Sequence, residues 1–294
     1  MSEHEPHSAS HDVAHDSRVN RIVEEALMED LGMGDVTTEA TVSGNLIGAA
    51  DLIAKESGVV AGLDIVGVVF SAIDSSIQTA ALVQEGSRVY SPALLARIEG
   101  PVASILKAER TSLNILQRMS GIATLTRKFV DAIAGMPVKV TDTRKTVPGL
   151  RLLDKLAVER GGGVNHRFGL DDMVLIKDNH IAAAGGITNA VNRCLALLSE
   201  RKRRLRIEVE TKTLDEVDEV LHVGGIHRIM LDNFSLDDMK KAVRRIHHSV
   251  EVEASGNVSL ATVRAIAETG VDFISVGALT HSSKALDISL EIKV

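Results

Sequence analysis

Five side chains that are cationic, or become so on protonation, gather in one part of the chain: Arg144, Lys145, His166, Arg167 and Lys177. Two of them carry guanidinium groups, which bind planar carboxylates through two parallel hydrogen bonds. The whole chain has a formal net charge of −7, so this concentration of positive charge would draw anions toward it. We therefore predict that these residues bind a planar, anionic substrate.

Two carboxylates, Glu210 and Asp232, each end an apolar run in the same part of the chain. Carboxylate oxygens are hard ligands, and Mg²⁺ is commonly held by one or two carboxylates together with substrate phosphates. The pair therefore predicts a Mg²⁺ site, reached directly or through water. The alternative is that each acid only neutralises a neighbouring lysine or arginine.

Small residues and glycines follow the last two apolar runs of the chain. Glycine lets backbone N–H groups approach phosphate oxygens, and the last two loops of α/β barrels often hold a phosphate. Tight turns before helices would use the same residue types. The residues predicted to meet a phosphate are Ser255, Gly256, Asn257, Val276, Gly277 and Ala278.

Three consecutive glycines, Gly161–Gly163, precede His166 and Arg167. They indicate a flexible loop or a close approach of the backbone to a ligand. His166 could transfer protons, or it could be a neutral group that positions its neighbours through hydrogen bonds. We favour the positioning role.

The elements that must position these residues are short β-branched runs, each followed by a helical stretch. Such apolar strands, alternating with helices, are typical of parallel βαβ units covered on both faces. Six or seven units, counting a short strand near Val164, favour an α/β barrel over an open doubly wound sheet, and the polar strand ends of a barrel face a common mouth. No GxGxxG follows these runs, so no motif supports a dinucleotide fold. The predicted strands are Val138–Thr143, Met173–Lys177, Ile207–Glu210, Ile229–Asp232, Val250–Ala254 and Phe273–Val276.

The chain before Pro137 has a mixed α and β pattern. Apolar residues recur at three- and four-residue spacing from Arg18 to Leu31, which predicts an amphipathic helix. Pro101 suits the first turn of a long helix, which we expect Gly121 to interrupt before a second helix runs to about Ala134. The other predicted elements are the strands Ile47–Lys55, Ser76–Val83 and Ala93–Glu99 and the helix Leu63–Ile73.

The composition limits the classes of function. The chain has 294 residues, 45% of them hydrophobic and 25% charged, which is enough to bury a sizeable core. One cysteine, Cys194, cannot form an internal disulfide and points to a reducing compartment, so we expect a cytoplasmic protein. Few aromatic residues and a negative net charge argue against nucleic-acid binding, and no apolar run reaches the roughly 18 residues of a membrane span.

The longest informative motif is TDTRKTVPGLRLLDKLAVERGGGVNHRFGLDDMVLIKDNHI, accompanied by EDLGMGDVTTEA, ERTSLN, IEVET, MLDN, EASGN and SVGALTHS. Together these segments resemble the quinolinate phosphoribosyltransferase family, also called the carboxylating nicotinate-nucleotide pyrophosphorylases. The resemblance extends from about Arg18 to the end of the chain. It leaves out a leader, residues 1–17, which holds four of the 11 histidines and which we expect to be disordered.

The resemblance implies an α/β fold with two domains. An N-terminal α/β sandwich would span residues 18–120, and an incomplete seven-stranded α/β barrel would span residues 121–282. Residues 283–294 would return to the N-terminal domain. The family also implies a homodimer or larger homo-oligomer whose active site lies at the subunit interface.

The activity implied is transfer of the phosphoribosyl group of phosphoribosyl pyrophosphate to quinolinate with decarboxylation, which yields nicotinate mononucleotide, pyrophosphate and CO₂ for NAD biosynthesis. Catalysis would fall to Lys145, Lys177, Glu210 and Asp232, with Mg²⁺ as cofactor. Glu210 and Asp232 would meet ribose hydroxyls or Mg²⁺, and the 5′-phosphate would lie at residues 255–257 and 276–278. The groups implied to hold the two substrates are Arg144, Lys145, His166, Arg167, Lys177 and, from the neighbouring subunit, Arg110.

Three other functions fit part of the pattern. A phosphoribosyltransferase of the same architecture could act on nicotinate without decarboxylation, but a substrate with one carboxylate needs fewer cations. A Schiff-base lyase could use Lys145 or Lys177 at a strand end. A non-catalytic phosphate sensor would leave Glu210 and Asp232 with little purpose.

Overall fold

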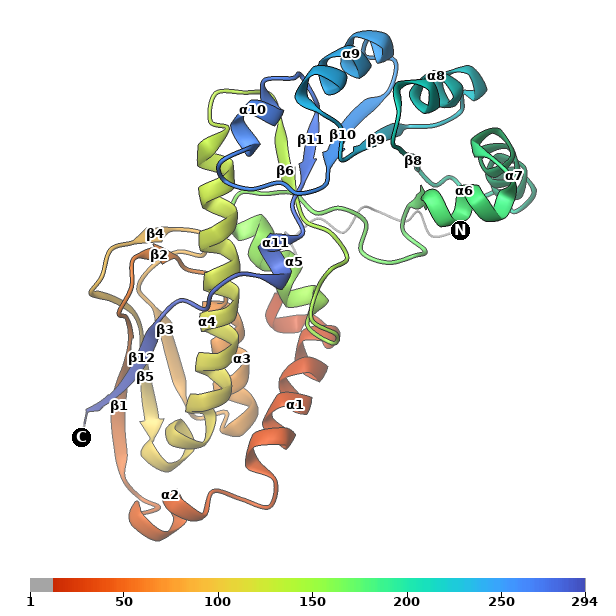
Figure 1. The fold of residues 1–294 in the computed structure, drawn as a ribbon. Coiled ribbons are helices and arrows are strands. Elements are labelled where there is room, and N and C mark those ends of the chain that lie inside the picture. Colours follow the sequence, from red (N-terminus) through yellow and green to blue (C-terminus); the bar gives the residue numbers. More distant parts are fainter. Residues whose placement is uncertain (1–12, 294) are drawn as a thin grey trace. The chain divides into compact units, whose positions relative to one another are not determined.

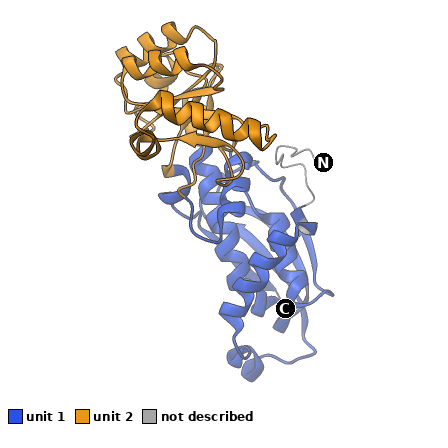
Figure 2. Cartoon of the chain, turned by 90° about the vertical axis from the view of Figure 1, so that its right-hand side faces the viewer, with its two compact units in different colours: residues 1–127, 146–162, 279–294 blue, residues 128–145, 163–278 orange. Residues whose placement is uncertain are grey.

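The computed structural model describes residues 13–293, which divide into the two compact units coloured in Figure 2. The first unit contains the chain up to Arg127, Thr146–Gly162 and the segment that starts at Leu279. The second unit contains Lys128–Lys145 and Gly163–Ala278.

Most of the expected leader, residues 1–12, lies outside the described residues. Val13–His15 form a 3-10 helix (η1), and the Asp16 side chain accepts a 2.8 Å hydrogen bond from the backbone N–H of Arg18. Residues 13–17 are therefore folded, which corrects the expectation of disorder as far as residue 17. The physical reason is that Asp16 supplies the N-cap of the first α-helix.

The first unit is built on a four-stranded antiparallel sheet of order β12-β1-β5-β3 (Figure 1). β12 pairs with β1, so the end of the chain joins a sheet formed near its beginning, and β2 and β4 form a separate ribbon. The strands are β1 (Ile47–Ala54), β2 (Gly58–Val59), β3 (Gln78–Ala81), β4 (Arg88–Val89), β5 (Ala93–Pro101) and β12 (Ile288–Lys293). The helices wholly within this unit are α1 (Ser17–Leu31), α2 (Val36–Thr41), α3 (Leu63–Ile73) and α5 (Arg151–Arg160).

α4 (Val102–Ala132) is one continuous helix of 31 residues, which corrects the expectation that Gly121 interrupts it. A Cβ at residue 121 would lie 2.2 Å from the backbone oxygen of Lys284 and 3.0 Å from Cα of Ala285. Gly121 therefore lets the C-terminal segment pack directly against the helix. The packing outweighs the roughly 1 kcal/mol by which glycine is worse than alanine in a helix interior.

The second unit is a parallel sheet of six strands in the order β6-β11-β10-β9-β8-β7. Val164 forms a parallel bridge with Thr141 of β6 and adds a minimal seventh strand, so the incomplete α/β barrel is confirmed. The strands are β6 (Lys139–Thr141), β7 (Val174–Ile176), β8 (Ile207–Thr211), β9 (Arg228–Asp232), β10 (Glu251–Ser255) and β11 (Phe273–Ser275). The helices are α6 (Asp178–Ala184), α7 (Ile187–Glu200), α8 (Leu214–Val223), α9 (Leu236–Ile246) and α10 (Val263–Ala267). A further helix, α11 (Ala278–His281), begins at the last residue of the second unit and continues in the first unit.

The central strands of this sheet are buried almost along their whole length, as parallel strands between helices should be. Side chains alternate between the two faces of a strand. Glu208 and Glu210 therefore share one face of β8, and Glu253 and Ser255 share one face of β10. This alternation places charged residues on the inner face of the barrel below the strand ends.

Among the described residues no single helix is long and apolar enough to cross a membrane; only α6 and α7 taken together pass by length and composition, and they are bent by 89°.

Replacement of Gly121 by alanine tests its packing role, because the sign of the change in unfolding free energy differs between the two explanations. Helix propensity alone would stabilise the variant by roughly 1 kcal/mol, whereas the clash with Lys284 should destabilise it by roughly 1–3 kcal/mol. Gly67→Ala in α3 is the control, since its nearest neighbour is the terminal hydroxyl of Thr79 at 3.2 Å. Denaturant unfolding of both variants decides the question, and a Gly121→Ala protein more stable than the wild type would refute the packing role.

Candidate active site

The carboxyl ends of the six parallel strands meet at one edge of the sheet, and most of the predicted site residues follow those ends. Arg144 and Lys145 follow β6, Lys177 follows β7, and Glu210 lies in β8. Asp232 ends β9 and Ser255 ends β10, followed by Gly256 and Asn257, and Val276 and Gly277 lie between β11 and α11, which Ala278 begins. His166 and Arg167 come just after Val164. Arg110 lies on α4 in the first unit and is exposed.

The guanidinium group of Arg167 is fixed by burial and by a backbone contact, and it feels the charge of Arg144. Arg167 is buried and donates from Nη1 to the backbone oxygen of Met173 at 2.9 Å. Burial, and next the positive charge of Arg144, lower the pKa of Arg167. Two like charges kept close enough to repel each other favour a bound anion, which would relieve the repulsion.

A carboxylate pair lies on the neighbouring strands β8 and β9. Burial, and next the negative charge of Asp232, raise the pKa of Glu210, while Lys177 and Lys212 act in the opposite direction. Lys212 also forms an ion pair with Asp178 at 2.7 Å, which joins the segment after β8 to the start of α6. Paired oxygen donors of this kind suit Mg²⁺, so the residues present fit the predicted cofactor.

The loops after β9 and β10 are joined through Asn233, which has a φ of +57°. Its Nδ2 donates to Oδ2 of Asp232 at 3.0 Å, and its Oδ1 accepts from Nδ2 of Asn257 at 3.0 Å. A Cβ on Gly256, whose φ is +98°, would lie 2.2 Å from that Oδ1. Gly256 thus makes room for the Asn233 side chain, whatever further role it has toward a phosphate.

The remaining predicted residues have few described contacts with this group. Lys145 is exposed, and its backbone N–H donates to Oγ1 of Thr143 at 3.1 Å. Val276 is buried, and its N–H donates to the backbone oxygen of Thr141 at 2.9 Å, which joins the ends of β11 and β6.

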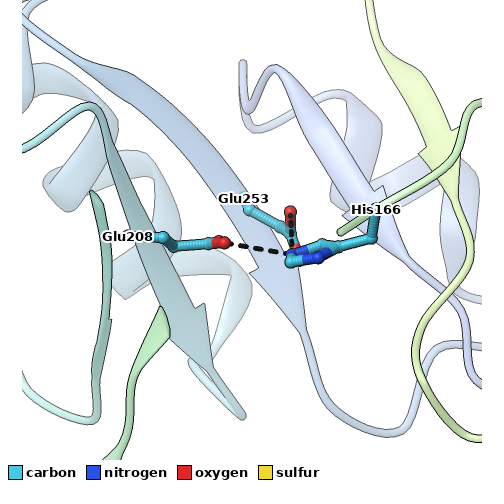
Figure 3. A group of neighbouring side chains, drawn as sticks. All are labelled: His166, Glu208 and Glu253. Carbon is cyan, nitrogen blue, oxygen red and sulfur yellow. Dashed lines mark ion pairs between the residues drawn. The ribbon is translucent and has the colours of Figure 1, made fainter. Parts of the chain in front are cut away.

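Beneath the strand ends lies a buried cluster that consists of His166, Glu208 and Glu253 (Figure 3). Nε2 of His166 lies 3.0 Å from Oε2 of Glu208 and 3.6 Å from Oε2 of Glu253. The side chains of both glutamates are completely buried. Each of the three residues has an atom within 4.8 Å of the others, a spacing that a metal ion could also use.

Arg228 supplies positive charge to this cluster. Its Nη1 lies 2.7 Å from Oε2 of Glu253 and its Nη2 lies 3.0 Å from Oε2 of Glu251, while its guanidinium carbon lies 3.8 Å from the centroid of the Phe273 ring. Burial opposes charge on Arg228, but Glu253 and Glu208 outweigh it and raise its pKa. Since a guanidinium already neutralises Glu253, we interpret the cluster as an internal ion network.

The two buried glutamates resist ionisation. Burial raises the pKa of Glu208 to about 7, although Arg228 and Arg167 favour its charged form. Burial, and next the charge of Glu208, raise the pKa of Glu253 to about 7. Glu251 differs, because hydrogen bonds from Arg228 and Arg206 overcome its burial and lower its pKa.

Of these residues the sequence predicted His166 as a site residue, but it did not predict Glu208, Glu253 or Asn233. A signal was present in IEVE and EVEAS, where glutamates alternate with apolar residues. That spacing puts Glu208 on the same inner face as Glu210, one layer deeper. Arg228 is the first residue of β9, whereas the site prediction considered only residues at the carboxyl ends of strands.

The fold defines an α/β-barrel protein whose strand ends present several cations and a pair of carboxylates. Comparison with known families narrows this class. Residues 35–120 match the family model described as quinolinate phosphoribosyl transferase, N-terminal domain, and residues 122–291 match the one for the C-terminal domain. The chain belongs to the quinolinate phosphoribosyltransferase family.

Individual relatives agree with this assignment. The chain is 46% identical over 286 residues to quinolinate phosphoribosyltransferase [decarboxylating] 1b of Nicotiana tabacum, which covers 92% of this chain and 81% of the relative. It is 47% identical over 286 residues to the chloroplastic nicotinate-nucleotide pyrophosphorylase [carboxylating] of Arabidopsis thaliana, over 92% and 82% of the two chains. The solved nicotinate-nucleotide pyrophosphorylase of Francisella tularensis superposes with a TM-score of 0.88 at 42% identity and covers 94% of this chain and 96% of its own.

Glu253 should make the stability of the fold depend on pH. A carboxyl group whose pKa is raised by folding binds its proton more tightly in the folded state, so its contribution to stability falls as pH rises from about 4.5 to about 7. We expect the difference in unfolding free energy between the wild type and Glu253→Gln to fall by roughly 2–3 kcal/mol between pH 5 and pH 8. Chemical unfolding at one protein concentration measures it.

Glu251→Gln is the matched control, because the lowered pKa of Glu251 moves its titration below this pH range. The corresponding difference for Glu251→Gln should be flat between pH 5 and pH 8. If the Glu253→Gln difference were equally flat, Glu253 would titrate normally in the folded protein.

Proposed function

We propose that the protein transfers the phosphoribosyl group of phosphoribosyl pyrophosphate to quinolinate and releases pyrophosphate and CO₂, forming nicotinate mononucleotide for NAD biosynthesis. Relatives named for this reaction match over most of their length. The observation that carries the proposal is that cations and carboxylates follow the carboxyl ends of the parallel strands: Arg144, Lys145 and Lys177 together with Glu210, Asp232 and the buried Arg167. That arrangement suits a planar dicarboxylate next to a polyphosphate.

Each group of the mouth has a part in this proposal. Arg144 and Arg167 bind the quinolinate carboxylates, and Lys145 and Lys177 bind phosphate oxygens and share the charge of the departing pyrophosphate. The ribose hydroxyls lie toward Glu210 and Asp232. The 5′-phosphate lies at residues 255–257 and 276–278, in the loops after β10 and β11.

The reaction needs no general base, because the lone pair of the pyridine nitrogen is free at neutral pH. The nitrogen attacks C1 of the ribose through a transition state with oxocarbenium character, and the C1–O bond to pyrophosphate breaks. When CO₂ then leaves, the electron pair of the broken C2–carboxylate bond stays on C2, where the adjacent positive ring nitrogen stabilises it, and this pair binds a proton. The contribution of the protein's own side chains is to position the two substrates and to stabilise the developing charge with lysines and arginines.

Mg²⁺ is the proposed cofactor, with Glu210 and Asp232 as the groups that hold it directly or through water. When bound, it supplies positive charge that stabilises the leaving pyrophosphate. Lys177 and Lys212 oppose the rise in the pKa of Glu210, so their positive charges partly balance the negative charge of Glu210 and Asp232.

The proposed assembly is a homodimer or larger homo-oligomer in which Arg110 acts in the partner's site. We also propose a cytoplasmic location, on the ground that the chain has a single cysteine. Neither nucleic acid nor a membrane is needed as a partner.

The activity itself is tested by incubating the protein with quinolinate, phosphoribosyl pyrophosphate and Mg²⁺. The amount of nicotinate mononucleotide, identified by its mass, and the amount of CO₂ released should rise together in a one-to-one molar ratio. Nicotinate in place of quinolinate distinguishes the rival without decarboxylation, and borohydride trapping with a carbonyl substrate tests the Schiff-base alternative. Turnover of nicotinate with none of quinolinate would overturn the proposed function.

Removal of Mg²⁺ should abolish turnover. We expect the metal to stabilise the charge of the leaving group by several kcal/mol. Excess EDTA with metal-free reagents should therefore lower the rate about a hundredfold or more, and added Mg²⁺ should restore it. Undiminished turnover in EDTA would show that lysine and arginine side chains alone suffice.

The in-trans role of Arg110 can be tested by mixing two inactive proteins, Arg110→Ala and Lys145→Ala, under conditions that exchange subunits. A mixed dimer joins one intact Lys145 mouth to one intact Arg110. Random exchange should therefore recover up to roughly a quarter of the wild-type sites. If native mass spectrometry confirms exchange and no activity returns, Arg110 acts within its own chain or only supports the fold.

A further inference from the structure

The segment that contains His166 adds to one border of the incomplete barrel. The N–H of Val164 donates to the backbone oxygen of Val140 at 2.9 Å, and the N–H of Asp142 donates to the oxygen of Val164 at 3.3 Å. The backbone N–H of His166 then donates to Oδ1 of Asp142 at 2.8 Å. Residues 164–166 are thus fixed beside β6.

Arg167 reaches toward the other border. Its Nη1 donates to the backbone oxygen of Met173, the residue directly before β7, and the N–H of Phe168 donates to Oδ2 of Asp172 at 2.7 Å. β6 and β7 are the two end strands of the six-stranded sheet. The orientation of Arg167 therefore depends on where the backbone at residues 166–168 is held between these ends.

The His166 ring connects this backbone to the barrel interior. Its Nδ1 accepts a 2.8 Å hydrogen bond from the N–H of Arg167, so Nδ1 carries no proton and the ring proton resides on Nε2. Nε2 faces Glu208 from β8 and Glu253 from β10 (Figure 3). Among the described residues neither carboxylate oxygen of Glu208 forms a hydrogen bond, so Nε2 of His166, at 3.0 Å, is its ion-pair neighbour.

We propose that Glu208 and Glu253 are positioning residues for substrate recognition: they keep the proton of His166 on Nε2, so that Nδ1 accepts the Arg167 amide and fixes the Arg167 guanidinium for the quinolinate carboxylate. This inference rests on the proposed function, and it makes His166 a positioning residue as well. Nε2 points into the barrel interior, so it is the Nδ1 side that serves the mouth.

A pair of histidine variants separates positioning from direct contact. Asparagine at residue 166 places an acceptor near the former Nδ1 and leaves nothing at Nε2, whereas glutamine places an amide near Nε2 and leaves no acceptor for Arg167. We expect His166→Asn to raise the KM for quinolinate by less than about threefold, and His166→Gln by roughly five- to thirtyfold. If His166 acted through Nε2 on the substrate, the order would be reversed.

Glu208→Gln and Glu251→Gln form the second pair. Both remove one carboxylate from an inner barrel strand, but Glu251 contacts Arg228 and Arg206 and makes no described contact with His166. Glu208→Gln should raise the KM for quinolinate roughly five- to thirtyfold with less than about a twofold change for phosphoribosyl pyrophosphate, and Glu251→Gln should change neither. In the His166→Asn background, Glu208→Gln should have no further effect, because the ring through which it acts is gone.

Amide hydrogen exchange at Arg167 gives a readout that does not depend on turnover. Exchange should be faster in Glu208→Gln and His166→Gln than in the wild type, and unchanged in Glu251→Gln. Suppose that the wild type turns over quinolinate. If His166→Gln then raised the KM for quinolinate less than His166→Asn, or if the two glutamate variants changed it equally, the positioning role alone would be overturned. A wild type that does not turn over quinolinate would overturn the proposed function, and the exchange rates would still decide whether Glu208 fixes Arg167.

Discussion

Burial of two carboxylates inside the barrel is the constraint on which the second unit depends. An unpaired charge in a dry interior is strongly unfavourable, and Glu208 and Glu253 are both completely buried. Arg228 and the His166 ring make the arrangement tolerable, and Phe273 packs under the guanidinium of Arg228. Since an apolar interior of equal volume is often as stable as a buried ion pair, stability alone does not explain the cluster. Its effect is to fix directions, because each charged group has to face its partner.

This constraint links the barrel interior to the mouth. Glu208 and Glu210 stand on the same face of β8 in successive layers, so one strand contributes both to the internal network and to the carboxylate pair. Likewise His166 faces the interior, while its neighbour Arg167 donates to the backbone oxygen of Met173 beside β7. Contacts with the barrel strands therefore fix Arg167, and fixed groups of this kind suit a reaction that depends on positioning.

The sequence predicts the barrel well, because its strands are β-branched runs with polar ends at regular intervals. It also predicts which strand ends gather the charged groups, as Glu210 and Asp232 illustrate. The predicted helix break at Gly121 was wrong, because the role of this glycine depends on its close approach to Lys284, which is distant in sequence and which no local pattern reveals. The interior cluster was missed for a related reason: an acidic residue inside a strand looks like surface charge until the topology brings Glu253, Arg228 and His166 around it. The mouth residues follow from local pattern, whereas the groups that orient them follow from tertiary contacts.

The proton on the His166 ring is the most direct test of this account. Two-bond ¹H–¹⁵N correlation spectra of protein labelled with ¹⁵N-histidine distinguish a protonated from an unprotonated ring nitrogen, and the signals of His166 are assigned by their loss in His166→Asn. The account predicts a neutral ring with the proton on Nε2 and a free lone pair on Nδ1 that accepts the Arg167 amide proton. A proton on Nδ1, in either the neutral or the doubly protonated ring, would contradict it, because the Arg167 N–H would then have no acceptor on the ring.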